Sequence, residues 1–505
     1  HGLNLGFLHC TLSGVRDVAR EAALACRSVM RRQLLPFVMS LALLGTAWQT
    51  RATDSAGDRP PVVVSNPPAA SLATPLISVR RIPLFLQAPE ADRRLVSDLE
   101  GVVSGLPNNS CVAVTEHGRL IYGANETAPL VPASTQKLVL ALAALEKMGG
   151  DRIFSTKLLS RSAPVNGIVD GDVWLVGGGD PLLMTKDYVD RFDDSMAYTD
   201  MGLLADQVVD AGISSIAGAV IGDESWFDSL RYVDTWPARF RPGQQNQTGP
   251  LSALSVNDGF TWWHAENTAN GLNTPANDPA AFAAAFFDDL LEDRDMVIKR
   301  PAQAGIAPLD AVIELASIDS PPLTDIVNQM LVTSDNTTAE LLLKALGAEV
   351  GPPGSTVKGT EVVLAALVAA GHDLTGIFAA DGSGLDAGNR VTCDILTSLL
   401  EDTEHGPSLV SSMAIAGLSG TMRRRLAGSS AEGRTRAKTG TLRDVASLVG
   451  QVESIEGRVL TFAVMTNAEP LPSGVKSLHD QVVLNLVTYP SGPDLELLVP
   501  LAVAG

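Results

Sequence analysis

Three short motifs carry residue types suited to nucleophilic catalysis. They are Ser134-Thr135-Gln136-Lys137, Ser334-Asp335-Asn336 and Lys438-Thr439-Gly440, in this order along the chain. Serine is a weak nucleophile at neutral pH and needs an adjacent base. A lysine three residues after a serine lies on the same helix face, and burial lowers the pKa of its amine toward the working range of a base. The first motif therefore predicts Ser134 as a nucleophile and Lys137 as its base.

Local sequence separates this Ser-x-x-Lys motif from two others, at 355–358 and 473–476. Residues 138–145, which follow Lys137, are all apolar, and a helix that is apolar all round is buried. The residues after Lys358 and Lys476 are polar, which indicates solvated lysines. No histidine lies in or beside the three motifs, so a Ser-His-Asp triad is not expected.

The second and third motifs supply groups that a proton relay and a substrate site need. The Ser334 hydroxyl could bridge Lys137 and Lys438 and pass a proton to a leaving amine. Asn336 offers both a donor and an acceptor, which suits it to orienting Lys137 and holding a substrate amide. A nearby cation such as Lys438 would lower the pKa of Lys137 further.

Residues 436–442 read as an edge strand on which a substrate could lie. Gly440 would leave room for a ligand backbone, which could pair with the strand by β-augmentation. Lys438 and Thr439 are candidates for binding a carboxylate, and the backbone N–H groups of Ser134 and Thr441 for an oxyanion hole. Arg436 could assist the carboxylate site or be a solvated strand charge.

The motif set resembles that of the class C low-molecular-mass penicillin-binding proteins, the D-alanyl-D-alanine carboxypeptidase/endopeptidase family. The resemblance spans roughly residues 95–489 and includes segments 177–182, 254–259, 381–385 and 420–422. It implies Ser134 as the acylated nucleophile and Lys137 as the base. It further implies roles in proton relay and substrate contact for Ser334, Asn336, Lys438 and Thr439.

The expected architecture is α+β, with a five-stranded antiparallel sheet flanked by helices, the penicillin-recognising serine transpeptidase/β-lactamase-like fold implied by the resemblance. The pattern predicts helices and strands at 92–104, 111–122 (a hairpin), 134 onward, 323–331, 338–346, 436–442, 445–453, 458–466 and 475–488. From Ser134 to Ser334 is 334 − 134 = 200 residues, far longer than in class A β-lactamases. This interval predicts an inserted domain of strands and turns.

The expected division of the chain has six segments, two of which belong to one peptidase domain. They are a leader (1–52), a Pro/Ala/Ser-rich spacer (53–90), the N-terminal segment of the peptidase domain (91–160), the inserted domain (161–315), the C-terminal segment of the peptidase domain (316–490) and a tail (491–505).

The leader has the pattern of a secretory signal. Met30-Arg31-Arg32 precedes an apolar run at 34–44 and small residues at 45–47. The run is short for a membrane span, so a signal is favoured over a membrane anchor. We therefore expect Met30 to be the start of translation and the protein to be extracytoplasmic, in the periplasm or cell wall, with membrane association if the segment is retained.

Composition and the remaining patterns exclude some function classes. The net charge of −20 argues against nucleic-acid binding. No metal-ligand spacing occurs, so neither metal nor cofactor is expected. Cys111 and Cys393 could pair or remain buried thiols. The glycine-rich segments at 177–180 and 381–383 are predicted turns, and residues 423–425 a solvated basic face.

The sequence therefore favours a serine-type D-Ala-D-Ala carboxypeptidase or endopeptidase acting on peptidoglycan stem peptides, with β-lactams as inhibitors. Two alternatives stay open. One is a β-lactamase or esterase on the same scaffold, and the other is a non-catalytic cell-wall-binding protein.

Overall fold

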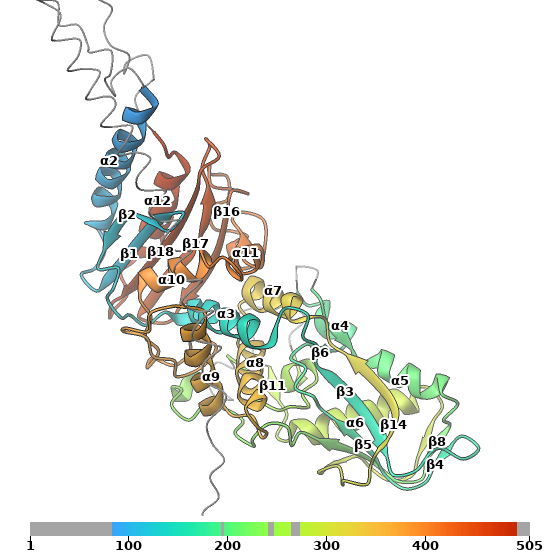
Figure 1. Ribbon diagram of the computed structural model, residues 1–505. Coiled ribbons are helices and arrows are strands. Elements are labelled where there is room, and N and C mark those ends of the chain that lie inside the picture. Colours follow the sequence, from blue (N-terminus) through green and yellow to red (C-terminus); the bar gives the residue numbers. More distant parts are fainter. Residues whose placement is uncertain (1–82, 193–195, 241–246, 264–272, 492–505) are drawn as a thin grey trace, which may run out of the picture. The chain divides into compact units, whose positions relative to one another are not determined.

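The computed structural model describes residues 83–192, 196–240, 247–263 and 273–491 (Figure 1). The expected leader, including the signal near residues 30–48, and the C-terminal tail after residue 491 lie outside these ranges. Within the described ranges, no helix combines the length and apolarity that crossing a bilayer would require.

The main sheet confirms the expected antiparallel core and extends it by one short strand. Its order is β15-β16-β17-β18-β1-β2, with every neighbouring pair antiparallel. The strands are β1 (Ser110–Glu116), β2 (Arg119–Ala124), β15 (Ala414–Ile415), β16 (Thr435–Thr441), β17 (Val445–Glu453) and β18 (Val459–Asn467). The sixth strand, β15, pairs with Ala437 and Arg436 and is too short to show a two-residue alternation in sequence.

Helices cover both faces of this sheet, and side-chain alternation along the strands divides its core in two. On β1, Val112 and Val114 join the apolar cluster of α2 and α12, whereas Cys111 and Ala113 join that of α3 and α10. Figure 1 shows α2 and α12 beside the sheet. The helices are α2 (Pro83–Val103), α3 (Gln136–Met148), α7 (Leu323–Thr333), α8 (Asn336–Glu349), α9 (Thr356–Ala369), α10 (Cys393–Leu400), α11 (Gly406–Ser411) and α12 (Val475–Val487).

A second sheet is formed by the residues between Ser134 and Ser334. Its order is β13-β9-β5-β3-β14, and helices α5 and α6 pack against its strands β14 and β9. Its elements are β3 (Ser155–Ser160), β5 (Val173–Val176), α5 (Met201–Asp210), β9 (Val220–Asp223), α6 (Pro279–Glu292), β13 (Gln303–Ala304) and β14 (Ile313–Asp319).

Shorter elements connect these strands and helices. They are β4 (Ile168–Val169), β6 (Leu183–Met184), α4 (Lys186–Val189), β7 (Thr199–Asp200), β8 (Ser215–Ile216), β10 (Phe260–Trp262), β11 (Thr274–Pro275) and β12 (Val297–Ile298).

This insertion differs from its expected form in two respects. It contains the helices α5 and α6 as well as strands and turns, and the apolar face of α6 is buried in its core. The expected boundaries at 160/161 and 315/316 also run through or beside paired strands, because β3 pairs along its whole length with β14. The paired strands themselves span residues 155–160 and 313–319.

A disulfide joins the two cysteines whose state the sequence left open. Cys111 of β1 and Cys393, the first residue of α10, are bonded across a separation of 282 residues. The bond ties strand β1 to α10, a helix on the face of the sheet that also carries α3.

Candidate active site

Ser134 and Lys137 lie where a 3-10 turn passes into a buried helix. The turn η2 (Ala133–Thr135) runs directly into α3. Ser134 is partly exposed, whereas the Lys137 side chain is fully buried. The Lys137 Nζ atom lies 3.2 Å from Ser134 Oγ, 2.7 Å from Asn336 Oδ1 and 2.7 Å from the Ser383 carbonyl oxygen. The structure thus brings the predicted serine and lysine together on one turn.

The protonated amine can donate to all three oxygens, and the same contacts can hold the neutral form. A neutral lysine amine has two N–H donors and one lone pair. The two 2.7 Å contacts are to oxygens that can only accept, so they take the two donors. The lone pair is then directed at Ser134 Oγ, which carries the proton that a base must remove.

Burial makes the neutral amine accessible near neutral pH. Removal from water lowers the pKa of Lys137 to about 8, against the opposing charges of Asp381, Glu340 and Asp335. An amine with this pKa is neutral in a useful fraction of molecules at pH 7–8, as a general base requires.

The Ser334 motif is presented by a tight connection between α7 and α8. Ser334 ends α7 in the left-handed conformation, with φ of 64°. Asp335 caps α8, because its Oδ1 accepts from the Thr338 N–H while its Oδ2 accepts from Gln329 Nε2. Asn336 therefore begins α8 beside Lys137.

Lys438 completes the constellation from β16. Its Nζ atom donates to Ser334 Oγ at 2.7 Å and to the Thr439 carbonyl at 2.9 Å. Burial, and then the charge of Lys137, hold the pKa of Lys438 well below its usual value. Ser334 is hydrogen-bonded to Lys438, while Lys137 is bonded to Asn336, so two lysine-centred pairs flank Ser134.

The edge of β16 runs past Ser134 and is closely packed at Gly440. A Cβ on Gly440 would lie 2.1 Å from Ser447 Oγ, 2.6 Å from the Pro132 carbonyl and 3.1 Å from the Ser134 nitrogen. Ser447 Oγ in turn donates to the Pro132 carbonyl. The sequence assigned the space at Gly440 to a ligand backbone, whereas in the structure the turn that carries Ser134 fills it.

The other two residues of this strand segment remain accessible. Thr439 is partly buried and Thr441 is exposed, which leaves both available to a substrate on the strand edge.

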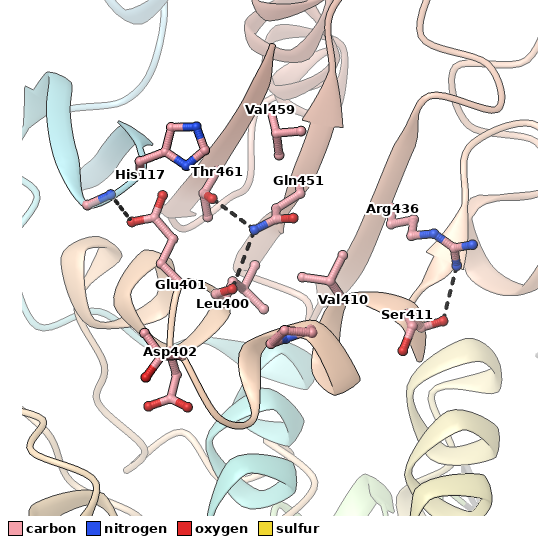
Figure 2. A pocket seen from close by; sticks show the side chains of 13 residues that line it. His117, Leu400, Glu401, Asp402, Val410, Ser411, Arg436, Gln451, Val459 and Thr461 are labelled. Atoms are coloured by element: carbon pink, nitrogen blue, oxygen red, sulfur yellow. Dashed lines mark hydrogen bonds between the residues drawn. The ribbon is translucent and has the colours of Figure 1, made fainter. Parts of the chain in front are cut away.

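Arg436 faces a separate pocket. It donates to the Ser411 carbonyl and lines a cavity of about 630 Å³ between strands β16–β18 and the α10–α11 segment (Figure 2). Figure 2 also shows Gln451 bonded to Thr461 and to the Leu400 carbonyl, with Glu401 across the cavity. None of the three motifs lines this cavity, and Arg436 contacts a backbone carbonyl there.

Sequence reasoning missed the segment behind Lys137. The glycine-rich bend at 381–385 was predicted as a turn only, yet the Ser383 carbonyl is a direct partner of Lys137. Glu340 of α8 accepts from the backbone N–H groups of Gly382 and Ser383. Its signal in the sequence is a lone acidic residue in the apolar run 339–343, one turn after Asn336.

The insertion also reaches the motif residues. Asn336 Nδ2 donates to the Gln247 carbonyl at 2.9 Å, and the Gly249 N–H donates to Thr337 Oγ1 at 3.0 Å. One segment of the insertion is therefore hydrogen-bonded to the first turn of α8.

The competing patterns have structural explanations. Ser355 caps α9 by accepting from the Lys358 N–H, and Lys358 Nζ donates to two backbone carbonyls. Ser473 and Lys476 are exposed. Within the expected solvated face at 423–425, Arg425 instead forms a partly buried ion pair with Asp480.

One group of described side chains has the donor atoms of a metal site. Carboxylate oxygens of Glu146 and Glu404 and a ring nitrogen of His405 lie within 4.8 Å of one another. His405 Nε2 is already paired with Glu146 Oε2 at 2.9 Å. The group contains no motif residue, and the hydrogen bond between His405 and Glu146 accounts for two of its three members.

Comparison with known proteins supports the same family as the motifs. Residues 97–297 and 271–485 match the D-Ala-D-Ala carboxypeptidase 3 (S13) family. A D-alanyl-D-alanine carboxypeptidase of Actinomadura sp. (strain R39) is 30% identical over 461 residues, covering 77% of this chain and 82% of the relative. A carboxypeptidase of Mycobacterium tuberculosis is 30% identical over 430 residues, covering 82% and 86%.

Solved structures show the same fold. Penicillin-binding protein 4 of Haemophilus influenzae superposes with a TM-score of 0.64 at 22% identity, over 77% of this chain and 98% of that one. The motifs, the sheet and the relatives agree, and the chain belongs to the D-Ala-D-Ala carboxypeptidase 3 (S13) family.

Proposed function

We propose that this chain is a serine-type D-Ala-D-Ala carboxypeptidase or endopeptidase that acts on peptidoglycan stem peptides and is acylated by penicillin. The observation that carries the proposal is the position of the Lys137 amine, bound to Asn336 Oδ1 and the Ser383 carbonyl with Ser134 Oγ as its third neighbour. Membership of the family and the carboxypeptidase names of the relatives point to the same reaction.

Acylation follows from this arrangement. Neutral Lys137 takes the Ser134 proton as Ser134 Oγ attacks the carbonyl carbon of the penultimate D-alanine. The N–H groups of Ser134 and Thr441 stabilise the oxyanion. The C–N bond then breaks, the Lys438–Ser334 pair supplies a proton to the leaving amine, and D-alanine departs. Water then attacks the Ser134 ester, and Lys137 returns its proton to the departing Ser134 oxygen. A proton from the water restores the Lys438–Ser334 pair.

Substrate binding would use the open edge of β16. An extended stem peptide would pair with this strand beyond Gly440, and Lys438 and Thr439 would bind its terminal carboxylate. Cleavage of a cross-linked peptide uses the same chemistry with a larger leaving group. A β-lactam presents a carboxylate and a strained amide to the same residues.

The proposed site of action is outside the cytoplasm. The signal-like segment at 30–47, the substrate class and the Cys111–Cys393 disulfide support export to the periplasm or cell wall. We also propose that the chain divides into a peptidase domain of two segments and an insertion bounded near residues 154 and 320, as strand pairing favours.

Labelling with a fluorescent penicillin tests the function. The wild type should give a stable covalent band, and Ser134→Ala should abolish it. Ser473→Ala is the matched control, because this exposed serine belongs to a competing Ser-x-x-Lys motif, and it should label as the wild type does. Rapid penicillin turnover without a stable band would favour a β-lactamase. A wild type that neither binds nor hydrolyses penicillin would favour the non-catalytic wall-binding alternative.

A further inference from the structure

Glu340 is a buried carboxylate that the acylation steps above do not use. It lies on α8, four residues after Asn336, so both side chains project from the same helix face. Asn336 contacts Lys137 directly. Glu340 contacts the segment that supplies the other acceptor, because its Oε1 receives the Ser383 N–H at 2.7 Å and the Gly382 N–H at 3.1 Å. One face of α8 thus supplies one of the two oxygens that accept from Lys137 Nζ and contacts the segment that supplies the other.

The two acidic side chains behind Lys137 differ in how they are satisfied. Asp381 accepts from five donors, including the Trp236 indole N–H at 2.8 Å and the Asn389 amide at 2.7 Å. These hydrogen bonds lower the pKa of Asp381, although burial raises it by more. Glu340 receives its two N–H bonds on one oxygen, and its Oε2 has no hydrogen-bond partner among the residues that the structure describes. Glu340 is therefore the less completely hydrogen-bonded of the two acids.

We propose that Glu340 is a positioning residue with two effects on Ser134 acylation. Through the 382–383 backbone it holds the Ser383 carbonyl against Lys137, and through its charge it sets the pH above which Lys137 becomes the neutral base. The inference rests on the proposed function, because it concerns acylation of Ser134.

The charges around Glu340 fix the direction of the second effect. Burial, and then the charge of Asp381, raise the pKa of Glu340 to about 8, while the Ser383 hydrogen bonds and the charge of Lys137 lower it. Ionised Glu340 in turn raises the pKa of Lys137. Lys344, one turn further along α8, also faces this carboxylate and is itself paired with Asp228. Removing the Glu340 charge without removing its acceptor should therefore lower the pKa of Lys137.

Glu340→Gln makes this change with nearly the same shape, because the amide oxygen can still accept from the Gly382 and Ser383 N–H groups. The measurement is the second-order rate constant for acylation by a fluorescent penicillin between pH 5 and 9. In the wild type the rate should rise with pH as Lys137 loses its proton. In Glu340→Gln the rise in rate should occur at lower pH than in the wild type.

Two further variants separate charge from position. Glu340→Asp keeps the carboxyl group but withdraws its oxygen from the 382–383 backbone. The pH at which the acylation rate rises should therefore stay near that of the wild type. The maximal acylation rate at high pH should fall about tenfold or more. Glu340→Asp also provides the test should Glu340→Gln not fold. Glu349→Gln is the control, because Glu349 lies at the exposed end of α8 and pairs with Arg152. It should leave both the pH at which the rate rises and the maximal rate unchanged.

The outcomes distinguish this inference from the function on which it rests. A wild type that is not acylated refutes the function. The inference is refuted if the wild type is acylated at a rate that does not rise with pH. It is also refuted if the rate of Glu340→Gln rises at the same pH as that of the wild type. If Glu340→Gln is unfolded, a maximal acylation rate of Glu340→Asp equal to that of the wild type refutes the positioning effect.

Discussion

Lys137 and Lys438 show how residues of one type acquire different tasks from their neighbours. Both amines are buried, and burial lowers the pKa of each. Lys137 is surrounded by carboxylates that oppose this effect, and its Nζ atom lies 3.2 Å from Ser134 Oγ. Lys438 instead holds the hydroxyl of Ser334. The first is placed to take a proton from the nucleophile, and the second to return one to the leaving group through Ser334.

Ser334→Ala tests the proton-returning task. Without the hydroxyl, Lys438 has no relay to the leaving nitrogen, so the acylation rate with penicillin should fall about 10²–10⁴-fold. The melting temperature should change little, because Ser334 is only partly buried. The exposed Ser477→Ala on α12 serves as the control and should acylate normally. Acylation of Ser334→Ala at the wild-type rate would rule out this task.

At the residue scale, the sequence predicts those properties of a side chain that depend on its neighbours along the chain. Lys137 could be distinguished from Lys358 because eight apolar residues follow it. Glu340 and Ser383 could not be identified as its partners, because they lie 203 and 246 residues away and meet it only through folding. The Ser383 contact is also made by a backbone carbonyl, which every residue type possesses.

At the scale of elements, the site depends on how closely β16 approaches the turn η2. The two touch where Gly440 faces Pro132 and the Ser134 nitrogen, and Ser447 of β17 bonds to the Pro132 carbonyl from the neighbouring strand. The strand edge and the nucleophile are therefore held at a fixed spacing by backbone contacts.

Gly440→Ala tests this spacing. The added methyl would lie closer to Ser447 Oγ and the Pro132 carbonyl than side-chain carbons do, so β16 and η2 must separate. We expect the acylation rate to fall about 100-fold or more, because a displacement of about 1 Å at an active site has effects of this size. Gly101→Ala on α2 is the control, since its methyl would meet no atom within 4 Å. Unchanged acylation in Gly440→Ala would show that the spacing is not critical.

Long helices and strands with a clear hydrophobic repeat were predictable from the sequence. Very short strands, which exist only because they pair with another strand, were not. The three long strands β16, β17 and β18 and the helices α7, α8 and α12 lie within three residues of their expected bounds. The two-residue strands of the insertion exist because a partner strand satisfies their backbone, so their local sequence gives little signal.

On the scale of the whole molecule, the insertion contributes a buried polar cluster next to the Ser334 motif. Asp258, in the 3-10 turn η4 (Asn257–Gly259), accepts from the Tyr188 hydroxyl of α4 at 2.5 Å. Arg191 donates to the same hydroxyl, and the Trp263 ring packs edge-on against Tyr188. Burial, and then the charge of Asp335, raise the pKa of Asp258 to about 8. The charge of Asp335 in the Ser334 motif thus affects the pKa of a residue in the insertion.

This raised pKa gives the stability of the fold a definite pH dependence. An unfolded Asp258 ionises near its ordinary pKa, about 4, whereas the folded residue keeps its proton until about pH 8. Between these values the unfolded state is favoured increasingly as pH rises, so the cost of burying Asp258 is greater at pH 8 than at pH 5. The sign is opposite to that of a carboxylate in an ion pair, whose contribution is lost on acidification.

Asp258→Asn should remove this cost. Asparagine accepts the Tyr188 hydrogen bond and tolerates the left-handed backbone of Asp258, where φ is 56°. The variant should therefore be more stable than the wild type at pH 8, by a margin about 1–3 kcal/mol larger than at pH 5. Thermal unfolding at both pH values measures the margin, with the exposed Asp151→Asn as the control. A margin that is equal at the two pH values, or larger at pH 5, would mean that Asp258 is ionised in the folded protein and that the insertion holds a charge beside the Ser334 motif.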